Sequence, residues 1–245
     1  MRRIARKLEH DFAISLGEME AAITPATRLV ALSNLHNPTG ALIPAETLRA
    51  TGEMARRAGA HVLVDEVYLE MLFDLTSSRC GAFSLGDNFV VTSSLTKTYG
   101  LSSLRCGWIL AAPELARRIW LLNDLFAATP AHPAERLSVV AFDHLDRFRA
   151  RARDLIATNR ALLEAFLDAR AELECFRPPA GTVVFPRLTS GDPDRFFQLL
   201  RDKYETSVVP GRFFEMPRHF RLGIGGETAL LQAGLDRLGA ALEAW

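Results

Sequence analysis

The chain has no excess of charge of either sign. Its 29 Lys and Arg residues balance 29 Asp and Glu residues, so the formal net charge at pH 7 is zero. A balanced chain exerts no long-range attraction on nucleic acid or on an anionic lipid surface. We therefore expect no nucleic-acid partner and no membrane partner, and we expect small molecules as ligands.

Cysteine is scarce. The three thiols, Cys80, Cys106 and Cys175, are far apart and odd in number, which gives neither a disulfide framework nor the paired spacing of a metal site. The six histidines are scattered too, so we expect no metal. This pattern favours incidental or buried thiols in a reducing compartment.

Long hydrophobic runs are missing as well. No apolar stretch approaches the roughly 18 residues of a membrane-spanning helix. The basic start of the chain, residues 1–12, has no apolar stretch behind it and so does not resemble a secretory signal. We therefore expect a soluble, cytoplasmic protein.

The first half of the 245 residues alternates between strand and helix patterns. The apolar runs Leu29–Ser33 and His61–Asp65 flank a helical segment, Pro44–Gly59, which has proline in its first turn and glycine at its end. Strand, helix and strand at this spacing predict a right-handed βαβ unit in a mostly parallel sheet.

Two further strands are predicted at Asn88–Ser94 and Leu104–Ala112, on either side of a polar loop that contains Lys97. In open α/β sheets, ligands bind at the carboxyl ends of the strands. Asn37, Asp65 and the loop of Lys97 all follow the ends of predicted strands. We therefore expect these polar groups to converge at one edge of the sheet.

The second half has a different pattern. Apolar residues at helical spacing predict one long helix or two consecutive helices, and a final amphipathic segment predicts another. Between them lie two short extended runs and one more helix. These segments are 133–168, 181–186, 194–204, 219–224 and 227–245. They indicate a smaller α+β domain.

Lys97 lies among hydroxyl side chains, directly after an apolar strand and shortly before a glycine. In isolation, a lysine in a surface loop would be the simpler interpretation. Ser94 and Arg105 change it, because a hydroxyl donor and a fixed fork of charged donors together can hold a phosphate. A phosphate clamp beside a lysine suits a cofactor with an aldehyde at one end and a phosphate at the other.

Asp65 closes an apolar strand, where a carboxylate is costly to bury without a partner. The ring nitrogen of pyridoxal phosphate is such a partner, and an ionised carboxylate favours its protonated form. Tyr68 could place its phenol against the 3-oxygen of the same ring. A helix cap or structural ion pair for Asp65, and simple packing for Tyr68, are the alternative readings.

Arg221 lies in the extended run near the end of the chain. Phe220, Leu222 and Ile224 fall on one face of this run, whereas Arg221 shares the other face with glycines, which leave room for a ligand. A solvent-facing strand arginine is the alternative.

Four motifs match, in order and spacing, the signature of one enzyme family. They are Asn37-Pro38-Thr39-Gly40, Asp65-Glu66-Val67-Tyr68, Ser94-Leu95-Thr96-Lys97 and Arg105-Cys106-Gly107-Trp108. Each motif is weak alone, but together they resemble the class I/II aminotransferases, which are pyridoxal-phosphate (PLP) enzymes of fold type I. The resemblance extends over nearly the whole chain, including 210–214 and 219–222.

The resemblance implies an α/β fold. It implies a three-layer large domain with a mostly parallel sheet, incomplete at its N-terminus, which we place at 1–146. It also implies a smaller C-terminal α+β domain, which we place at 147–245. It implies PLP as the cofactor, held by Lys97 as a Schiff base. The implied cofactor-binding residues are Asn37, Asp65, Tyr68, Ser94, Lys97 and Arg105, and the implied substrate-binding residues are Arg221 and Asn37.

The implied reaction moves an amino group from an α-amino acid to a 2-oxo acid, in a homodimer. A PLP-dependent lyase or decarboxylase on the same fold is the nearest alternative, although an arginine for the α-carboxylate favours reactions that keep this group. Ser94-Leu95-Thr96-Lys97 also fits the S-x-x-K motif of acyl-enzymes. The S-D-N and K-T-G elements of that class do not occur here.

The large domain of this family begins well before the position equivalent to Met1. We find neither the glycine-rich turn that binds the cofactor phosphate nor the aromatic residue that stacks on the ring, and the first thirty residues contain one glycine, Gly17. We therefore expect an N-terminally truncated aminotransferase. Such a chain would be catalytically impaired and expose apolar sheet surface, unless a second polypeptide supplies the missing half.

Overall fold

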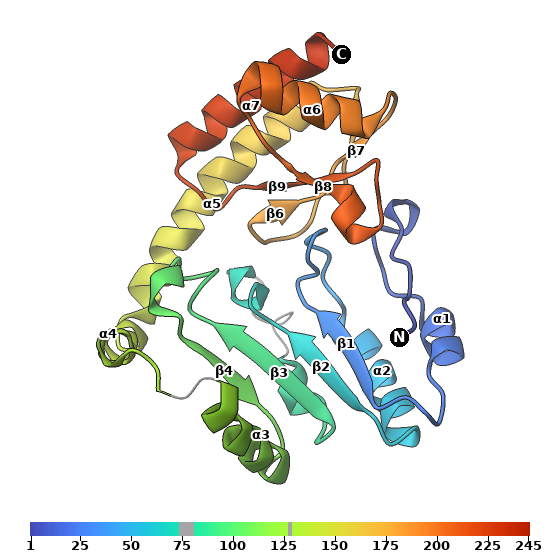
Figure 1. Ribbon diagram of the computed structural model, residues 1–245, viewed down its shortest axis with the longest axis vertical. Helices are drawn as coiled ribbons and strands as arrows, with labels where there is room; N and C mark the ends of the chain where they lie inside the picture. The colour runs from blue at the N-terminus through green and yellow to red at the C-terminus, as the bar shows by residue number, and fades with distance from the viewer. Residues whose placement is uncertain (74–80, 127–128) are drawn as a thin grey trace. The chain divides into compact units, whose positions relative to one another are not determined.

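The computed structural model describes residues 1–73, 81–126 and 129–245. These residues form two compact units, drawn as one ribbon in Figure 1. The first unit contains residues 1–36 and 41–152, and the second contains residues 37–40 and 153–245. The short turn 37–40 therefore groups with the C-terminal part of the chain. The domain boundary at 146/147 stays a prediction.

A four-stranded sheet forms the centre of the first unit. Its strands β1 (Leu29–Ser33), β2 (His61–Asp65), β3 (Phe89–Ser94) and β4 (Gly107–Leu110) lie side by side in chain order (Figure 1). The first three are parallel, and β4 is antiparallel to β3. The predicted α/β fold with a mostly parallel sheet is thereby confirmed.

Helix α2 (Ala45–Arg57) makes the crossover between β1 and β2. Pro44 precedes it, and two arginines in its last turn complement the helix dipole. Its buried face includes Leu48 and Gly52. A Cβ atom at Gly52 would lie 2.5 Å from the ring of Phe89, so glycine lets this helix approach the sheet closely.

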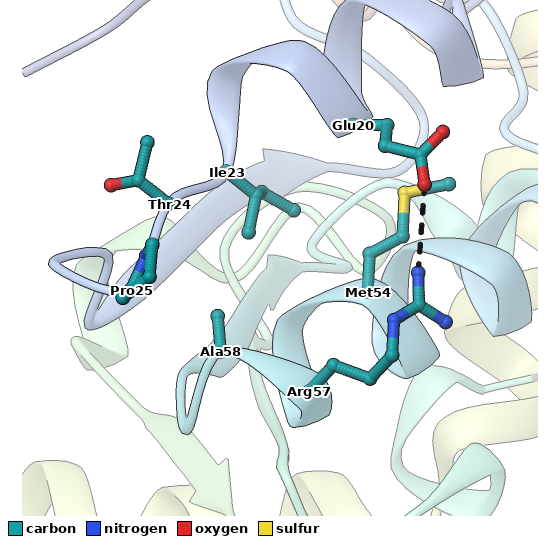
Figure 2. A pocket seen from close by; sticks show the side chains of 7 residues that line it. All are labelled: Glu20, Ile23, Thr24, Pro25, Met54, Arg57 and Ala58. Atoms are coloured by element: carbon teal, nitrogen blue, oxygen red, sulfur yellow. Dashed lines mark ion pairs between the residues drawn. The ribbon is translucent and has the colours of Figure 1, made fainter.

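Helix α1 (Leu16–Ala22) packs against α2 and is capped by Ser15, whose hydroxyl accepts a hydrogen bond from the Glu18 amide. A shallow pocket lies between these helices (Figure 2). It is lined by Glu20, Ile23, Thr24, Pro25, Met54, Arg57 and Ala58. An ion pair of 3.8 Å joins Arg57 and Glu20 across it.

The core of the first unit is built from side chains of α2 and of strands β2 and β3. Its buried members are Ile43, Leu48, Ala55, Ala60, Val62, Val64, Ala82, Phe89 and Val91. Short 3-10 helices connect the longer elements of the chain. They are η1 (Leu8–His10), η2 (Leu69–Met71), η4 (Ala82–Leu85), η5 (Ser102–Leu104) and η6 (Gly211–Phe214).

Helix α3 (Pro113–Phe126), which the sequence pattern did not predict, buries no residue among those described. Helix α4 (His132–Phe142) follows it. Large apolar side chains are exposed on both helices and on β4, and we call this group the α3–α4 apolar surface. It consists of Ile109, Leu110, Trp120, Leu121, Leu122, Leu125, Phe126, Leu137, Val139, Val140 and Phe142.

The apolar residues of α4 are largely exposed. Leu137 and Val140, two of the residues whose helical spacing predicts this helix, are 56% and 53% exposed. The helix forms as predicted, but no described segment covers the face that carries them. The outer edges of β1 and β4 also pair with no other described strand.

The second unit combines three helices with two small sheets. Strand β9 lies between β6 and β8, antiparallel to both, and β5 pairs with β7. The bounds are β5 (Leu173–Glu174), β6 (Val183–Val184), β7 (Arg187–Leu188), β8 (Val209–Pro210), β9 (Phe220–Gly223), α6 (Pro193–Tyr204) and α7 (Thr228–Glu243). Helix α5 (Leu145–Asp168) belongs to this unit from Arg153 onward.

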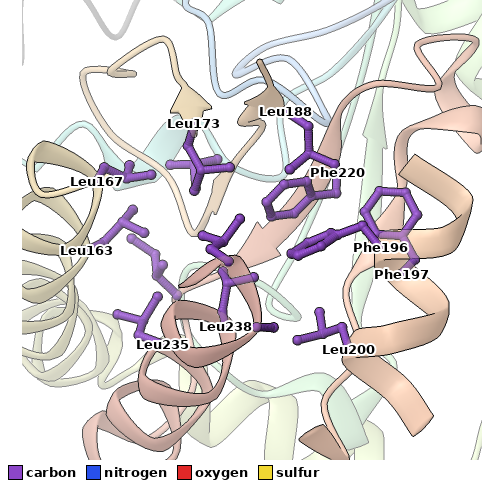
Figure 3. Packing of buried hydrophobic residues seen from close by; sticks show 14 of the residues in the cluster. Leu163, Leu167, Leu173, Leu188, Phe196, Phe197, Leu200, Phe220, Leu235 and Leu238 are labelled. Atoms are coloured by element: carbon purple, nitrogen blue, oxygen red, sulfur yellow. The ribbon is translucent and has the colours of Figure 1, made fainter. Parts of the chain in front are cut away.

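Leucine and phenylalanine side chains fill the core of the second unit (Figure 3). Leu163 and Leu167 project from α5, Leu235 and Leu238 from α7, and Phe196 from α6. These helices meet over the same cluster because each places its apolar residues three or four positions apart. The α+β character predicted for this half is therefore observed.

No helix within the described ranges is long and apolar enough to span a membrane. Two of the three cysteines, Cys106 and Cys175, are free thiols. Burial raises the pKa of Cys175 to about 11, so it is an inert thiol at neutral pH. Cys80 lies outside the described residues.

Candidate functional site

The parallel register places the ends of neighbouring strands of the first unit at one edge of the sheet. Ser33 at the end of β1 pairs with Asp65 at the end of β2, and Asp65 pairs with Thr92 of β3. Ser94, two residues later, ends β3 and lies opposite Gly107, where β4 begins. Asp65 and Ser94 therefore share the carboxyl edge of this sheet.

The carboxylate of Asp65 is exposed at this edge. One oxygen, Oδ1, accepts hydrogen bonds from the Val67 amide at 3.3 Å and from the Thr92 hydroxyl at 3.2 Å. These bonds fix the plane of the carboxylate. Within the described chain, Oδ2 has no hydrogen-bond partner and Asp65 has no ion pair, so this oxygen is available to a ligand carrying an N–H group.

Lys97 is held outward by its neighbours. Leu95, Thr98 and Tyr99 are buried, whereas Lys97 is exposed. The loop closes through a hydrogen bond of 3.1 Å from the Gly100 amide to the Lys97 carbonyl, and Gly100 has φ +70°. Glycine adopts this left-handed conformation without steric cost. The Lys97 amine has no hydrogen bond or ion pair to the described residues.

Ser94 and Arg105 flank the Lys97 loop. The Ser94 hydroxyl lies 2.7 Å from the Thr96 hydroxyl and accepts a hydrogen bond of 3.3 Å from the Thr96 amide. Arg105 donates through Nη1 to the Ser102 carbonyl at 3.2 Å. Its remaining N–H groups have no partner in the described parts of the chain, so they are available to an anion.

The position of Arg105 corrects the predicted strand Leu104–Ala112. Arg105 does not begin this strand, because its φ of +52° is incompatible with an extended conformation. It caps the short helix η5, and β4 begins two residues later.

Tyr68 lies three residues after Asp65 and is 6% exposed. Its neighbour Glu66 is also buried, and its Oε1 accepts a hydrogen bond of 2.7 Å from the Ala82 amide. The pKa of Glu66 is raised to about 7, mainly by burial and to a smaller extent by the charges of Glu70 and Asp65, against the lowering effect of the Ala82 hydrogen bond. Glu66 is thus a second carboxyl at this edge, facing the interior of the unit.

Asn37 and Arg221 meet within the second unit. Arg221 Nη1 donates to Asn37 Oδ1 at 2.8 Å, and its guanidinium lies 5.4 Å from the centre of the Phe214 ring. A Cβ atom at Gly223, two residues along the same strand face, would meet no atom within 4 Å. This open space beside Arg221 agrees with the room for a ligand that the sequence suggested.

Seven residues were predicted to form the site, and the structure groups them in two sets. Asp65, Tyr68, Ser94, Lys97 and Arg105 belong to the first unit, and Asn37 and Arg221 belong to the second. The convergence of Asn37 with Asp65 stays a prediction.

The pocket of Figure 2 is not this site. Pro25 precedes β1 and Ala58 precedes β2, so the pocket lies toward the amino ends of the strands, away from Asp65 and Ser94. No group of three or more His, Cys, Asp or Glu residues that could hold a metal ion occurs among the described residues.

Sequence reasoning did not identify Thr92 and Thr96, whose hydroxyls contact Asp65 and Ser94. Thr92 carried a detectable signal, because it begins the run of three hydroxyl residues that ends an apolar strand. The partner of Thr92 could not be inferred without the strand register.

The first unit is an open α/β sheet with an exposed lysine and a carboxylate at its carboxyl edge. The second is a small α+β unit that presents an arginine. This combination is typical of a class of cofactor-dependent enzymes. The sequence model of the family "Aminotransferase class I and II" matches residues 1–238. The chain therefore belongs to the class I and II aminotransferase family. PLP, the cofactor expected from the sequence, is confirmed as the cofactor of this family.

Known proteins of similar sequence and structure agree with this assignment. Capreomycidine synthase of Streptomyces vinaceus is 26% identical over 96% of this chain and 60% of its own length. Histidinol-phosphate aminotransferase 1 of Cupriavidus pinatubonensis is 34% identical over 93% of this chain and 60% of its own. The chain thus spans about 60% of the length of these curated relatives.

A crystal structure of a PLP-dependent aminotransferase from Streptococcus suis superposes with a TM-score of 0.91. It is 24% identical and is matched over 97% of this chain and 63% of its own. At this identity, the comparison shows the fold.

The described side chains fit PLP chemically. The Lys97 amine and one oxygen of Asp65 are unengaged within the described chain, and the Arg105 guanidinium retains donors for an anion. These are the three kinds of group that an aldehyde, a protonated ring nitrogen and a phosphate require.

The raised pKa of Glu66 predicts a pH-dependent stability. Because the folded pKa of about 7 exceeds the ordinary 4.5, the folded state holds this proton more tightly than the unfolded state. The resulting stabilisation is complete below about pH 4.5 and is lost as the pH rises to about 7. Glu66→Gln removes this loss while keeping an acceptor for Ala82, and should raise the stability at pH 8 by up to about 3 kcal/mol.

Urea unfolding at pH 5 and pH 8 measures this effect. The difference between Glu66→Gln and wild type should be larger at pH 8 than at pH 5. Glu53→Gln, on the exposed face of α2, is the matched control and should not alter the pH dependence. Equal differences at the two pH values would contradict the prediction.

Proposed function

We propose that the protein is a PLP-dependent aminotransferase that moves an amino group from an α-amino acid to a 2-oxo acid. The placement of the Lys97 amine and the Asp65 carboxylate at one carboxyl edge, flanked by Ser94 and Arg105, is the observation that carries this proposal. Membership of the aminotransferase family supports it.

The residues of the first unit would hold the cofactor. Lys97 would bind its aldehyde carbon covalently, Asp65 would pair with the ring nitrogen, and Tyr68 would contact the 3-oxygen. Ser94 and Arg105 would bind the phosphate, for which a hydroxyl and a charged fork are suitable donors. When bound, PLP supplies an electron sink for negative charge at the substrate α-carbon.

Lys97 would also move protons. Once the substrate amine has displaced it from the aldehyde carbon, the Lys97 amine would accept the proton from the substrate α-carbon as a general base and return a proton as a general acid. The exposure of Lys97 and its lack of a partner in the described chain support this role, because no internal contact must be broken first.

Arg221 would bind the α-carboxylate of the substrate, with Asn37 beside it. A planar guanidinium presents two parallel N–H groups that match a carboxylate. The hydrogen bond from Arg221 to Asn37 and the Phe214 ring already orient this group. A residue that binds the α-carboxylate favours transamination, because this reaction keeps the carboxylate on the substrate. Decarboxylation is the second candidate reaction on this fold.

Labelling tests the role of Lys97. After incubation with PLP, borohydride reduction should fix the cofactor on the peptide that contains Lys97, because only a lysine amine in contact with the aldehyde is trapped. Lys97→Ala should lose this label. Lys7→Ala, which removes an exposed lysine outside the site, is the control and should keep it. A labelled peptide that lacks Lys97 would refute the assignment.

Kinetics test the reaction and the role of Arg221. A panel of amino acids assayed against 2-oxoglutarate and pyruvate should show parallel initial-rate lines, which indicate a ping-pong mechanism. Arg221→Lys should raise KM for the amino donor by about tenfold or more, since lysine cannot supply two parallel N–H groups.

Arg212→Lys is the matched control, because Arg212 is exposed and pairs with Asp194. It should leave KM unchanged. Intersecting lines would count against transamination, and release of carbon dioxide in place of a 2-oxo acid would identify a decarboxylase.

We also propose that the protein forms a homodimer. The α3–α4 apolar surface supports self-association, since large apolar side chains exposed in this number are typical of interaction surfaces. Size-exclusion chromatography with light scattering should give a mass above that of the 27.1 kDa monomer. Replacing Leu125 and Phe126 together by Glu should lower this mass, whereas Arg117→Gln on the same helix should not. A monomeric wild type would refute the proposal.

A further inference from the structure

A buried amide interrupts the apolar face of α5 in the second unit. Asn159 is 0% exposed and lies on the same helix face as Ile156 and Leu163, which belong to the core. A polar side chain at such a position is costly unless all of its hydrogen-bonding groups are satisfied. The contacts of Asn159 therefore show what this residue does.

Asn159 fixes the end of strand β9. Its Nδ2 donates to the carbonyls of Ile224 and Gly226, both at 2.8 Å, and its Oδ1 accepts from the Thr228 hydroxyl at 2.7 Å. Both amide donors are used, and the amide oxygen has a partner. Because β9 ends at Gly223, these bonds hold the backbone directly after the strand that carries Arg221.

The adjacent residue on α5, Arg160, holds a second segment. Its Nη1 donates to the Pro178 carbonyl at 2.9 Å, and its Nη2 donates to the Gly181 carbonyl at 3.2 Å. One planar guanidinium thus binds two carbonyls of the segment 178–181. Two bonds from a rigid fork restrain this segment more than one bond would.

The segment 178–181 packs against the turn that carries Asn37. A Cβ atom at Gly40 would lie 2.7 Å from Pro178 Cβ and 3.2 Å from the Val183 carbonyl, so the turn and the segment are in close contact. Thr182, the residue that follows this segment, is tied to the end of β9, because its carbonyl accepts a hydrogen bond of 2.7 Å from the Ile224 amide.

We propose that Asn159 and Arg160 are positioning residues for Arg221. Asn159 fixes the backbone that follows the strand of Arg221. Arg160 holds the segment that packs against the turn of Asn37, whose side-chain oxygen accepts a hydrogen bond from the Arg221 guanidinium. Two neighbouring residues of one helix thus set both the backbone position and the side-chain direction of the arginine. The inference rests on the proposed function only for the identity of the ligand of Arg221.

Side-chain NMR on the arginine-labelled chain tests this inference without requiring activity. The Arg221 Nε–H signal is assigned by its loss in Arg221→Lys, and Asn37→Ala provides the signal of an Arg221 that has lost its acceptor. Asn159→Leu and Arg160→Met should each move the Arg221 signal toward its position in Asn37→Ala. Arg153→Met removes an exposed arginine of the same helix and should leave the signal unchanged.

Kinetics provide a second measurement. If the chain transaminates, Arg160→Met should raise KM for the amino donor by about tenfold, the equivalent of about 1.4 kcal/mol, with kcat within about twofold. Arg160→Lys retains one donor and should restore part of this loss. A merely structural role would lower the melting temperature and leave KM and the Arg221 signal of the folded protein unchanged.

The outcomes separate this inference from the proposed function. A shifted Arg221 signal in a chain whose Lys97 is not labelled by PLP and borohydride would support the positioning role and refute the proposed function. An unshifted signal in folded Arg160→Met would overturn the positioning role, even if transamination is observed. Because Arg160 lies outside the apolar core cluster, this variant decides the question if Asn159→Leu does not fold.

Discussion

The parallel pairing of β1, β2 and β3 is the constraint on which the candidate site depends. Hydrogen bonds of 2.8 Å continue this pairing beyond the strand ends, from the Asn34 amide to the Asp65 carbonyl and from the Glu66 amide to the Thr92 carbonyl. Since side chains alternate along a strand, a shift of one residue would turn Asp65 to the opposite face. The register therefore decides whether the Asp65 carboxylate and the loop of Lys97 can bind the same ligand.

Much of the first unit could be predicted from local patterns. The strands Leu29–Ser33 and His61–Asp65 have the predicted bounds, because each is a short apolar run ended by a polar residue or turn. Lys97 is predicted as a site residue from its hydroxyl neighbours and from the nearby Ser94 and Arg105. Such signals are contained within a few residues, so no knowledge of tertiary contacts is needed to detect them.

The remaining features depend on contacts between distant segments. The turn at Asn37 was assigned to the large domain because it follows β1, yet its packing against Pro178 and its bond to Arg221 group it with the second unit. Asn159 lies within the segment 133–168, whose apolar periodicity predicts a helix and nothing more about this residue. Its role depends on two carbonyls more than sixty residues away, which no local pattern can reveal. Helix α3 was not predicted, although Leu115, Ile119, Leu122 and Phe126 recur at helical spacing, so its local signal was overlooked.

The outer edges of β1 and β4, which pair with no other described strand, have a practical consequence. Neither β1, with the sequence LVALS, nor β4, with the sequence GWIL, contains a charged residue or a proline. Natural sheets usually protect their edges with such residues, because a bare edge accepts strands from other molecules. Edge-to-edge stacking of this kind is open-ended, so its extent grows with protein concentration. Keeping the protein dilute should therefore limit this association.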